Sequence, residues 1–225
     1  MTSIPIDLKN KALETPNINA AVVCPNEESV LLAVIEAKEI NLINPILIGK
    51  KSLIEKTANQ VNLEINSYNI IEINNEQEAA TVACKLAHED KVKIIIKGNL
   101  HTDILMRYYL KKEFNLLVGR RLSHIWHMTA QKLNKPLFIT DGALNVLPRV
   151  DIKLQILKNA VDFCNKLNIF KPKVAILSGT EDPIDSMPSS IEAQKVMELA
   201  NKENVDALVL DHLLLIMQYQ RKQLK

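Results

Sequence analysis

Short runs of apolar residues, many of them β-branched, recur along the chain and predict buried β-strands. Each run holds apolar residues at consecutive positions rather than alternate ones, which is typical of parallel strands covered on both faces. The predicted strands are AAVVC (20–24), PILIG (45–49), NIIEI (69–73), VKIIIKG (92–98), LFITDG (137–142), KVAILSG (173–179) and DALVLD (206–211).

Amphipathic helices are predicted between these strands. In residues 27–42, apolar side chains at Val30, Leu31, Val34, Ala37 and Ile40 share one helical face. Residues 75–90 and 151–167 show the same periodicity. Regular alternation of strands and helices predicts an α/β fold with right-handed crossovers.

A domain boundary is predicted near residues 132–136, where a polar connection precedes a new strand. We therefore expect a first α/β domain over residues 1–134 and the start of a second over 135–211, followed by a tail at 212–225.

Charge and composition exclude several classes of protein. The net charge is +2, but residues 212–225 hold Arg221, Lys222 and Lys225 and no acidic residue, so the rest carries 25 basic and 26 acidic residues, or −1. The body of the chain thus gives no electrostatic reason to expect nucleic-acid binding. Three widely spaced cysteines indicate a reducing compartment without structural zinc. No apolar leader or bilayer-length run is visible, so a cytoplasmic protein is predicted.

The first candidate site follows the strand at 92–98. Lys97 and Gly98 end the strand, and His101, Thr102 and Asp103 open a helix. A glycine allows close approach of a ligand to the backbone, Thr102 or Asp103 is predicted to cap the helix, and a helix N-terminus beside a lysine suits a phosphate. An ordinary strand–loop–helix connection explains the same residues.

Further candidates lie in VGRRLSHIWHM (118–128). Arg120 and Arg121 are suited to gripping a phosphate, although a solvated surface pair is an equal alternative. His124 and His127 are spaced one helical turn apart, but without a third ligand they are interpreted as packing groups.

The last candidates follow the later strands. Asp141 and Asn145 come directly after the run at 137–142. Ser189 and Ser190 follow Pro188, a helix-start signal first and a phosphate contact only second. No phosphate-binding glycine loop and no nucleophile-elbow motif is present, so these patterns predict an anion cleft without naming a reaction.

Several of these stretches occur in an order that resembles the phosphate acetyl/butyryltransferase family. They are KGNLHTDILM, GRRLSHIWHM, KPLFITDGALNVLP, KNAVDFCNKLNIFKPKVAILSG, SMPSSIEA and DALVLD. The resemblance implies two three-layer α/β/α domains of the isocitrate/isopropylmalate dehydrogenase-like type, here with an incomplete second domain, in a homodimer without membrane or nucleic-acid partners.

The implied reaction converts acyl-CoA and phosphate into acyl phosphate and CoA, with no cofactor or metal. The resemblance places these residues at the substrates: Lys97, Gly98, His101, Thr102, Arg120, Arg121, Ser123, Asp141, Asn145, Ser189 and Ser190. In the family a C-terminal serine, arginine and aspartate act in catalysis. That segment is not among these 225 residues, so the chain is expected to be inactive, with a non-catalytic protein that binds CoA, phosphate or a partner subunit as the alternative.

The tail HLLLIMQYQRKQLK does not resemble the family's next segment. Written in permitted codons and read in another frame, however, it yields PFAFDNAISTEAAK, which is similar to that segment. We hypothesise a frameshift near codon 211 that truncates the protein. A membrane-associated tail is a third alternative, which the absence of an amphipathic period disfavours.

Overall fold

The chain divides into two compact units, Met1–Val118 and Gly119–Lys225, each of which is described by itself. The computed structural model describes residues 5–129, 135–180 and 182–210. The predicted tail at 212–225 lies outside the described residues, as does the proposed frameshift point at codon 211.

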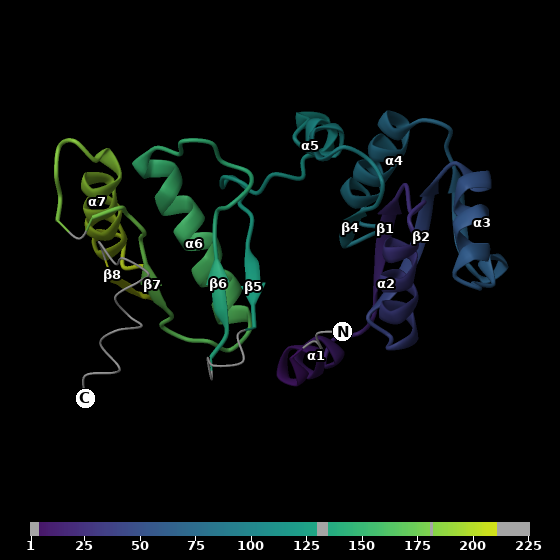
Figure 1. The fold of residues 1–225 in the computed structure, drawn as a ribbon, viewed down its shortest axis with the longest axis horizontal. Helices are drawn as coiled ribbons and strands as arrows, with labels where there is room; N and C mark the ends of the chain where they lie inside the picture. Colours follow the sequence, from purple (N-terminus) through teal and green to yellow (C-terminus); the bar gives the residue numbers. More distant parts are fainter. Residues whose placement is uncertain (1–4, 130–134, 181, 211–225) are drawn as a thin grey trace. The chain divides into compact units, whose positions relative to one another are not determined.

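The first unit is built on a four-stranded sheet with the order β3-β2-β1-β4. Figure 1 labels β1, β2 and β4 of this sheet. Its strands are β1 (Ile18–Val23), β2 (Ile43–Gly49), β3 (Asn69–Glu72) and β4 (Ile94–Lys97). All three pairings are parallel. The four N-terminal strand predictions and the parallel arrangement are therefore confirmed.

Helices cover both faces of this sheet. They are α2 (Glu28–Glu39), α3 (Lys51–Gln60), α4 (Glu76–His88) and α5 (Thr102–Tyr109). The remaining elements are α1 (Ile6–Leu13) and the 3-10 turns η1 (Ile65–Ser67) and η2 (Lys112–Phe114). The predicted helices at 27–42 and 75–90 correspond to α2 and α4.

Alternate residues of β1 supply the cores of the two layers. Ala21 and Val23 pack with alanines of α4, whereas Val22 packs with Leu31 of α2 and Ile54 of α3. Because successive strand side chains point to opposite faces, a strand buried between two helical layers must be apolar throughout. This explains why the run at 20–24 lacks polar alternation.

The second unit contains two separate pairs of strands and two long helices (Figure 1). The strands are β5 (Trp126–Met128), β6 (Leu137–Ile139), β7 (Lys173–Ala175) and β8 (Leu208–Leu210), and the helices are α6 (Val150–Lys166) and α7 (Pro188–Lys202). β7 and β8 pair in parallel, and their core packs against α6 and α7 through Leu157, Val161, Val196 and Val209.

Two ion pairs also join the helices of this unit. Lys153 on α6 contacts Glu192 on α7 at 2.6 Å, and Lys158 on α6 pairs with Glu203 directly after α7. Ion pairs thus stabilise the edges of the contact between α6 and α7, and apolar packing stabilises its centre.

The segment that precedes β6 differs from the sequence-based expectation. Trp126–Met128 forms a strand antiparallel to β6, whereas the spacing of His124 and His127 predicts a helical turn. That helical interpretation is wrong because Trp126 and Met128 pair with Ile139 and Leu137. The pairing also places residues 119–129 with the second unit, so the units divide earlier than the boundary predicted at 132–136.

Candidate functional site

The order of strands in the first sheet reverses between β1 and β4. The chain runs outward from β1 to β2 and β3, and then returns to place β4 on the other side of β1. In open parallel sheets, ligands bind at the carboxyl ends of the strands where the order reverses. Lys97 closes β4 at this edge and Cys24 follows β1 there, so the structure places the first predicted site at the switch point.

Gly98 brings the two strand ends together. Its amide donates to the carbonyl of Val23 at 2.8 Å, and the amide of Asn99 donates to the carbonyl of Cys24 at 2.8 Å. A Cβ on Gly98 would lie 2.3 Å from the Cys24 carbonyl oxygen. The group that approaches this glycine in the structure is the β1 backbone, and close approach of a ligand stays a prediction.

Lys97 holds the loop that follows Gly98. Its ammonium donates to the carbonyl oxygens of Gly98 at 3.2 Å and Leu100 at 3.0 Å. A lysine held in this way carries positive charge at the edge where β1 and β4 end. It therefore combines a structural role with the electrostatics that an anionic ligand requires.

Helix α5 begins at this loop with His101 as its N-cap residue. The prediction that Thr102 or Asp103 caps the helix is wrong: Thr102 is the first helical residue, and the N-cap makes no side-chain hydrogen bond. His101 and Thr102 are both exposed at the N-terminus of α5. They therefore remain accessible at the sheet edge on which the first site was predicted.

The other half of this edge was missed by sequence reasoning. Cys24 adopts a left-handed backbone with φ of 52°, and its carbonyl accepts hydrogen bonds from the amides of Asn26 and Asn99. Among the described residues, the side-chain oxygen of Asn26 is buried without a hydrogen-bond partner. The only available signal was the end of an apolar run, which does not reveal that β4 lies beside it.

In the second unit, Asn145 gathers three of the predicted groups into one polar network. Its oxygen accepts from Nε of Arg121 at 2.8 Å, and its Nδ2 donates to the carbonyl of Leu122 at 2.9 Å and to the carboxylate of Asp141. Asp141 stands two residues after Ile139, where β6 ends, whereas Asn145 lies further along and does not follow the strand directly. Their contacts position the Arg121 side chain.

Asp141 is held in its charged form by hydrogen bonds. Burial by itself raises the pKa of this carboxyl group, but the Asn145 side chain and the backbone amides of Ala143, Leu144 and His124 together outweigh burial and leave the pKa below its ordinary value. The amides of Ala143 and Leu144 both lie 3.1 Å from one carboxylate oxygen. Asp141 thus organises the turn after β6 as an ionised acceptor.

One face of α6 supports the arginine segment. Gln155 accepts from the amide of Arg121 at 2.7 Å, and Asn159 donates to the Arg121 carbonyl at 2.8 Å and to Ser123 Oγ at 2.9 Å. Asp162 pairs with Arg120. Sequence reasoning missed these three α6 residues, although their spacing of four and then three marks one helical face.

The two arginines therefore have different surroundings. Arg120 is engaged in an exposed ion pair with Asp162, whereas Nε of Arg121 is fixed by Asn145. The two arginines therefore do not form a single anion-binding pair. Arg121, whose backbone is held by Gln155 and Asn159 and whose side chain is held by Asn145, is better placed to meet an anion than Arg120.

The histidines of this segment pack against aromatic rings. His124 lies edge-on to Trp126 with ring centroids 4.8 Å apart, and His127 lies edge-on to Phe138 at 5.2 Å. Nδ1 of His124 is buried and has no hydrogen-bond partner among the described residues. These contacts agree with the interpretation of both histidines as packing groups.

The two serines at the start of α7 serve mainly that helix start. Ser190 is fully buried, and its hydroxyl donates to the Met187 carbonyl at 2.8 Å. Ser189 Oγ lies 3.1 Å from Ser178 Oγ. Pro188 occupies the first turn, which confirms the helix-start prediction. Ser190 is too buried to reach a phosphate in solution.

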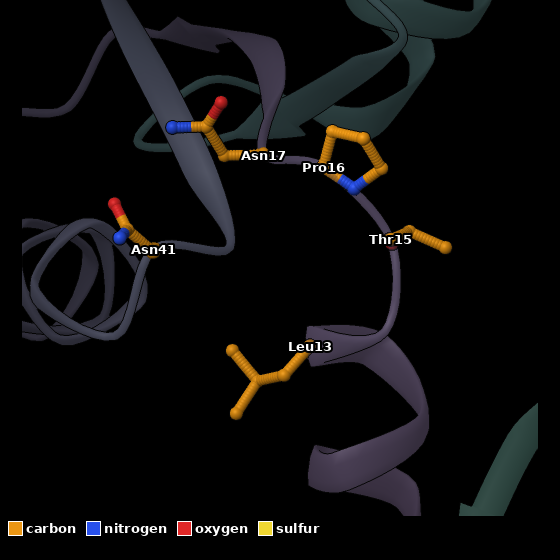
Figure 2. Close-up of a pocket in the computed structure, with 5 residues that line it drawn as sticks. All are labelled: Leu13, Thr15, Pro16, Asn17 and Asn41. Atoms are coloured by element: carbon orange, nitrogen blue, oxygen red, sulfur yellow. The ribbon is translucent and has the colours of Figure 1, made fainter.

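A shallow pocket of about 350 Å³ lies at the opposite, amino-terminal end of β1 (Figure 2). Its lining residues are Leu13, Thr15, Pro16, Asn17 and Asn41. None of these side chains carries a charge at neutral pH, and Asn17 and Asn41 precede β1 and β2. The pocket therefore lacks the cationic character that an anion site needs.

Within residues 5–129, 135–180 and 182–210, no cluster of three or more His, Cys, Asp or Glu side chains is able to hold a metal ion. In the same ranges, no helix has both the length and the apolar character needed to cross a bilayer.

Comparison with known proteins connects these features to a family. Residues 75–213 match the family described as Phosphate acetyl/butaryl transferase. The phosphate acetyltransferase of Rickettsia felis is 34% identical, over 92% of this chain and 59% of its own length. The phosphate butyryltransferase of Clostridium beijerinckii is 30% identical, over 91% of this chain and 68% of its own.

Solved structures show the same fold. A phosphotransacetylase from Streptococcus pyogenes superposes with a TM-score of 0.76 at 17% identity, covering 94% of this chain and 73% of that one. A branched-chain phosphotransacylase from Enterococcus faecalis gives 0.67 at 22% identity, covering 86% of this chain and 78% of that one. The 225 residues span 59% of the Rickettsia felis relative and 56% of one from Rickettsia prowazekii. The sequence matches establish that the chain belongs to the phosphate acetyl/butyryl transferase family.

Proposed function

We propose that the chain derives from a phosphate acyltransferase that converts acyl-CoA and phosphate into acyl phosphate and CoA. One observation carries the proposal: in a chain of this family, Lys97 and Gly98 stand at the sheet edge where the strand order reverses. The charge of Lys97 and the N-terminus of α5 attract an anion to that edge. In the other unit, Arg121, oriented by Asn145, is a separate candidate for contact with an anion.

The chemistry requires stabilisation of a tetrahedral oxyanion and protonation of the leaving thiolate. A phosphate oxygen attacks the thioester carbonyl carbon, and the resulting tetrahedral oxyanion collapses as the C–S bond breaks. The products are acyl phosphate and CoA thiolate, which then takes a proton. A cationic group such as Lys97 would stabilise the oxyanion. The proposed reaction uses CoA and phosphate as substrates and needs no further cofactor.

We further propose that these 225 residues alone bind a substrate without completing turnover. The serine, arginine and aspartate expected to act in catalysis from the family resemblance are not among them. The frameshift hypothesis gives one origin for this difference. Sequencing the DNA beyond codon 211 tests it: the alternative frame is expected to encode PFAFDNAIS and further family sequence, and unrelated sequence there would refute the idea.

One pair of measurements tests the proposed function. Acetyl-CoA and butyryl-CoA are each mixed with phosphate and the chain, thiol release is followed, and CoA and phosphate affinity is measured by calorimetry. We expect binding without thiol release above the protein-free rate. Thiol release above the protein-free rate would contradict the proposed inactivity. The absence of both binding and turnover would overturn the acyltransferase assignment for this chain.

Three finer expectations remain proposals. They are the isocitrate/isopropylmalate dehydrogenase-like form of the two domains, assembly as a homodimer and location in the cytoplasm. Light scattering of the purified chain tests the dimer, because a mass of 25.4 kDa in solution would contradict it.

A further inference from the structure

Asn159 on α6 uses both protons of its side-chain amide to hold the segment that contains Arg121 and Ser123. Its Nδ2 donates to the backbone carbonyl of Arg121 at 2.8 Å and to the hydroxyl oxygen of Ser123 at 2.9 Å. The orientation of the amide follows from the first of these partners, because a carbonyl oxygen only accepts and would repel Oδ1. The nitrogen of Asn159 therefore faces both groups, and each of its protons is taken.

This contact decides what the hydroxyl of Ser123 can do. A serine hydroxyl has one proton to donate and two lone pairs that accept. Because the oxygen accepts from Asn159, the proton of Ser123 is left for another partner. In the part of the chain that the structure describes, no protein acceptor is bonded to that proton. Ser123 is only partly buried, so a dissolved ligand that carries an acceptor can approach it.

The side chain of Arg121 also keeps donors available. Its Nε donates to Asn145 at 2.8 Å, while its two terminal nitrogens have no hydrogen-bond or ion-pair partner among the described residues. The nearby carboxylates of Asp141 and Asp162 are already engaged by other groups. The side chains of Arg121 and Ser123 thus offer donors only. The ionised oxygens of a phosphate group, which only accept, match that set.

Helix α6 is suited to hold this arrangement because its backbone is anchored in the core. Leu157 and Val161, which flank Asn159, are buried in the core that α6 shares with α7 and β8. Gln155 lies one turn before Asn159 on the same face and accepts from the amide of Arg121 at 2.7 Å. One rigid element therefore holds both the N–H and the carbonyl of Arg121.

We propose that Asn159 is a positioning residue for anion binding, which makes the Ser123 hydroxyl a hydrogen-bond donor to a phosphate oxygen. The family resemblance places Ser123 at the substrates but assigns no role to α6. The inference rests on the proposed function for its ligand, which is inorganic phosphate or a phosphate group of CoA. It adds the group that sets the direction of the serine proton.

A purely structural role for Asn159 predicts a different result. If the amide only held the segment in place, a change at Asn159 would weaken ligand binding whether or not Ser123 carried a hydroxyl. If Asn159 acts through Ser123, its effect on affinity requires that hydroxyl. A double-mutant cycle measured on ligand affinity, rather than on stability, separates the two roles.

The test begins with calorimetric titration of the full 225-residue chain with inorganic phosphate and, separately, with CoA. Ser123→Ala removes the donated proton and is expected to weaken binding about tenfold, as for a hydrogen bond to a charged group. Ser123→Thr keeps the hydroxyl and is expected to retain most of the affinity. A loss for inorganic phosphate identifies the phosphate substrate as the source of the oxygen, whereas a loss for CoA alone identifies a CoA phosphate.

Asn159→Asp reverses the contact, because a carboxylate accepts the proton of Ser123 and no longer leaves it for a ligand. Affinity is expected to fall by about tenfold or more. Gln155→Glu is the matched control, since it adds the same charge one turn away while its carboxylate still accepts from the amide of Arg121. Its effect is expected to stay within about threefold, the scale of an exposed charge interaction. In the Ser123→Ala background, Asn159→Asp is expected to show only this smaller effect.

Three results would overturn the inference while the proposed function stands. They are binding that Ser123→Ala leaves unchanged, equal losses for Asn159→Asp and Gln155→Glu, and an effect of Asn159→Asp that persists without the Ser123 hydroxyl. An unaltered chain that binds neither ligand overturns both proposals, and the first titration shows this before any variant is compared.

Circular dichroism checks that each variant folds. If Asn159→Asp does not fold, Asn159→Ala takes its place in the cycle. This change leaves the hydroxyl of Ser123 free to rotate, so it is expected to cost less affinity. Its loss must likewise vanish in the Ser123→Ala background, and a loss that remains there would overturn the inference.

Discussion

The carbonyl oxygen of Cys24 occupies the space that a side chain at Gly98 would need. A Cβ there would lie 2.3 Å from that oxygen, and the obstacle is backbone that cannot rotate away. The two residues join β1 to β4 at the edge where ligands are expected. The same contact therefore links the stability of the sheet to the geometry of the candidate site.

Replacing this glycine is expected to separate the two strand ends. Gly98→Ala should lower the free energy of unfolding by about 1–3 kcal/mol, as for other overpacked interiors. Urea denaturation of the variant measures the loss. Gly142→Ala is the matched control, because the nearest atoms to a Cβ there, on Trp126, are 4.0 Å away. Equal stability of the two variants would contradict the close approach.

Lys97 is expected to contribute to anion binding as well as to the loop. Lys97→Gln removes the charge, and its effect on phosphate or CoA affinity should be about ten- to a hundredfold, the range for a charged hydrogen bond. Lys93→Gln is the control: it removes the same charge just before the amino end of β4, and so shows the effect of net charge alone. Calorimetry separates the anion-binding role of Lys97 from its role in the loop. If Lys97→Gln leaves phosphate and CoA affinity unchanged but lowers the midpoint of unfolding, Lys97 only stabilises the loop.

The contact between Arg121 and Asn145 is expected to appear as an energetic coupling. In a double-mutant cycle with Arg121→Ala and Asn145→Ala, the free energies of unfolding should deviate from additivity by about 0.5–1 kcal/mol. The pair of Arg121→Ala with Asn201→Ala on α7 should be additive. An additive result for Arg121 with Asn145 would show that the 2.8 Å hydrogen bond does not contribute to stability.

Asp141 is expected to make stability depend on acidity. Its pKa is lower in the folded state than in the unfolded chain, where it is about 3.9. The stabilisation is therefore complete above that value and is lost as pH falls through the lower folded pKa. Urea midpoints between pH 6 and pH 3 should fall less steeply for Asp141→Asn than for Asp206→Asn, an exposed control. Identical slopes would count against the hydrogen-bonded carboxylate.

The three cysteines are expected to react slowly in the folded chain. Burial raises the pKa of Cys24 and Cys84 to about 11, and burial also raises that of Cys164. Because the thiolate is the reactive form, alkylation at pH 8 should be much slower than for a free thiol, and unfolding should expose all three. Rapid labelling of native protein at pH 8 would contradict these environments, and would also complicate an assay of thiol release.

Local patterns were sufficient for most of the secondary structure. The seven apolar runs correspond to β1, β2, β3, β4, β6, β7 and β8. For β1 the reason is that a strand between two helical layers needs apolar residues on both faces. The helical periods at 27–42, 75–90 and 151–167 likewise correspond to α2, α4 and α6. Among the described residues, the strand missed from sequence is β5, which spans three residues, has an exposed tryptophan at its start and is stabilised by its pairing with β6.

Contacts between distant segments were decided only by the tertiary structure. The pattern around Lys97 and Gly98 predicted an anion site, but only the placement of β4 beside β1 explains why residue 98 must be glycine. Gln155, Asn159 and Asp162 form a polar helical face in the sequence, yet their partners on the arginine segment are known only from the fold. A sequence determines which face of an element is apolar or polar; which surface meets that face depends on how the whole chain packs.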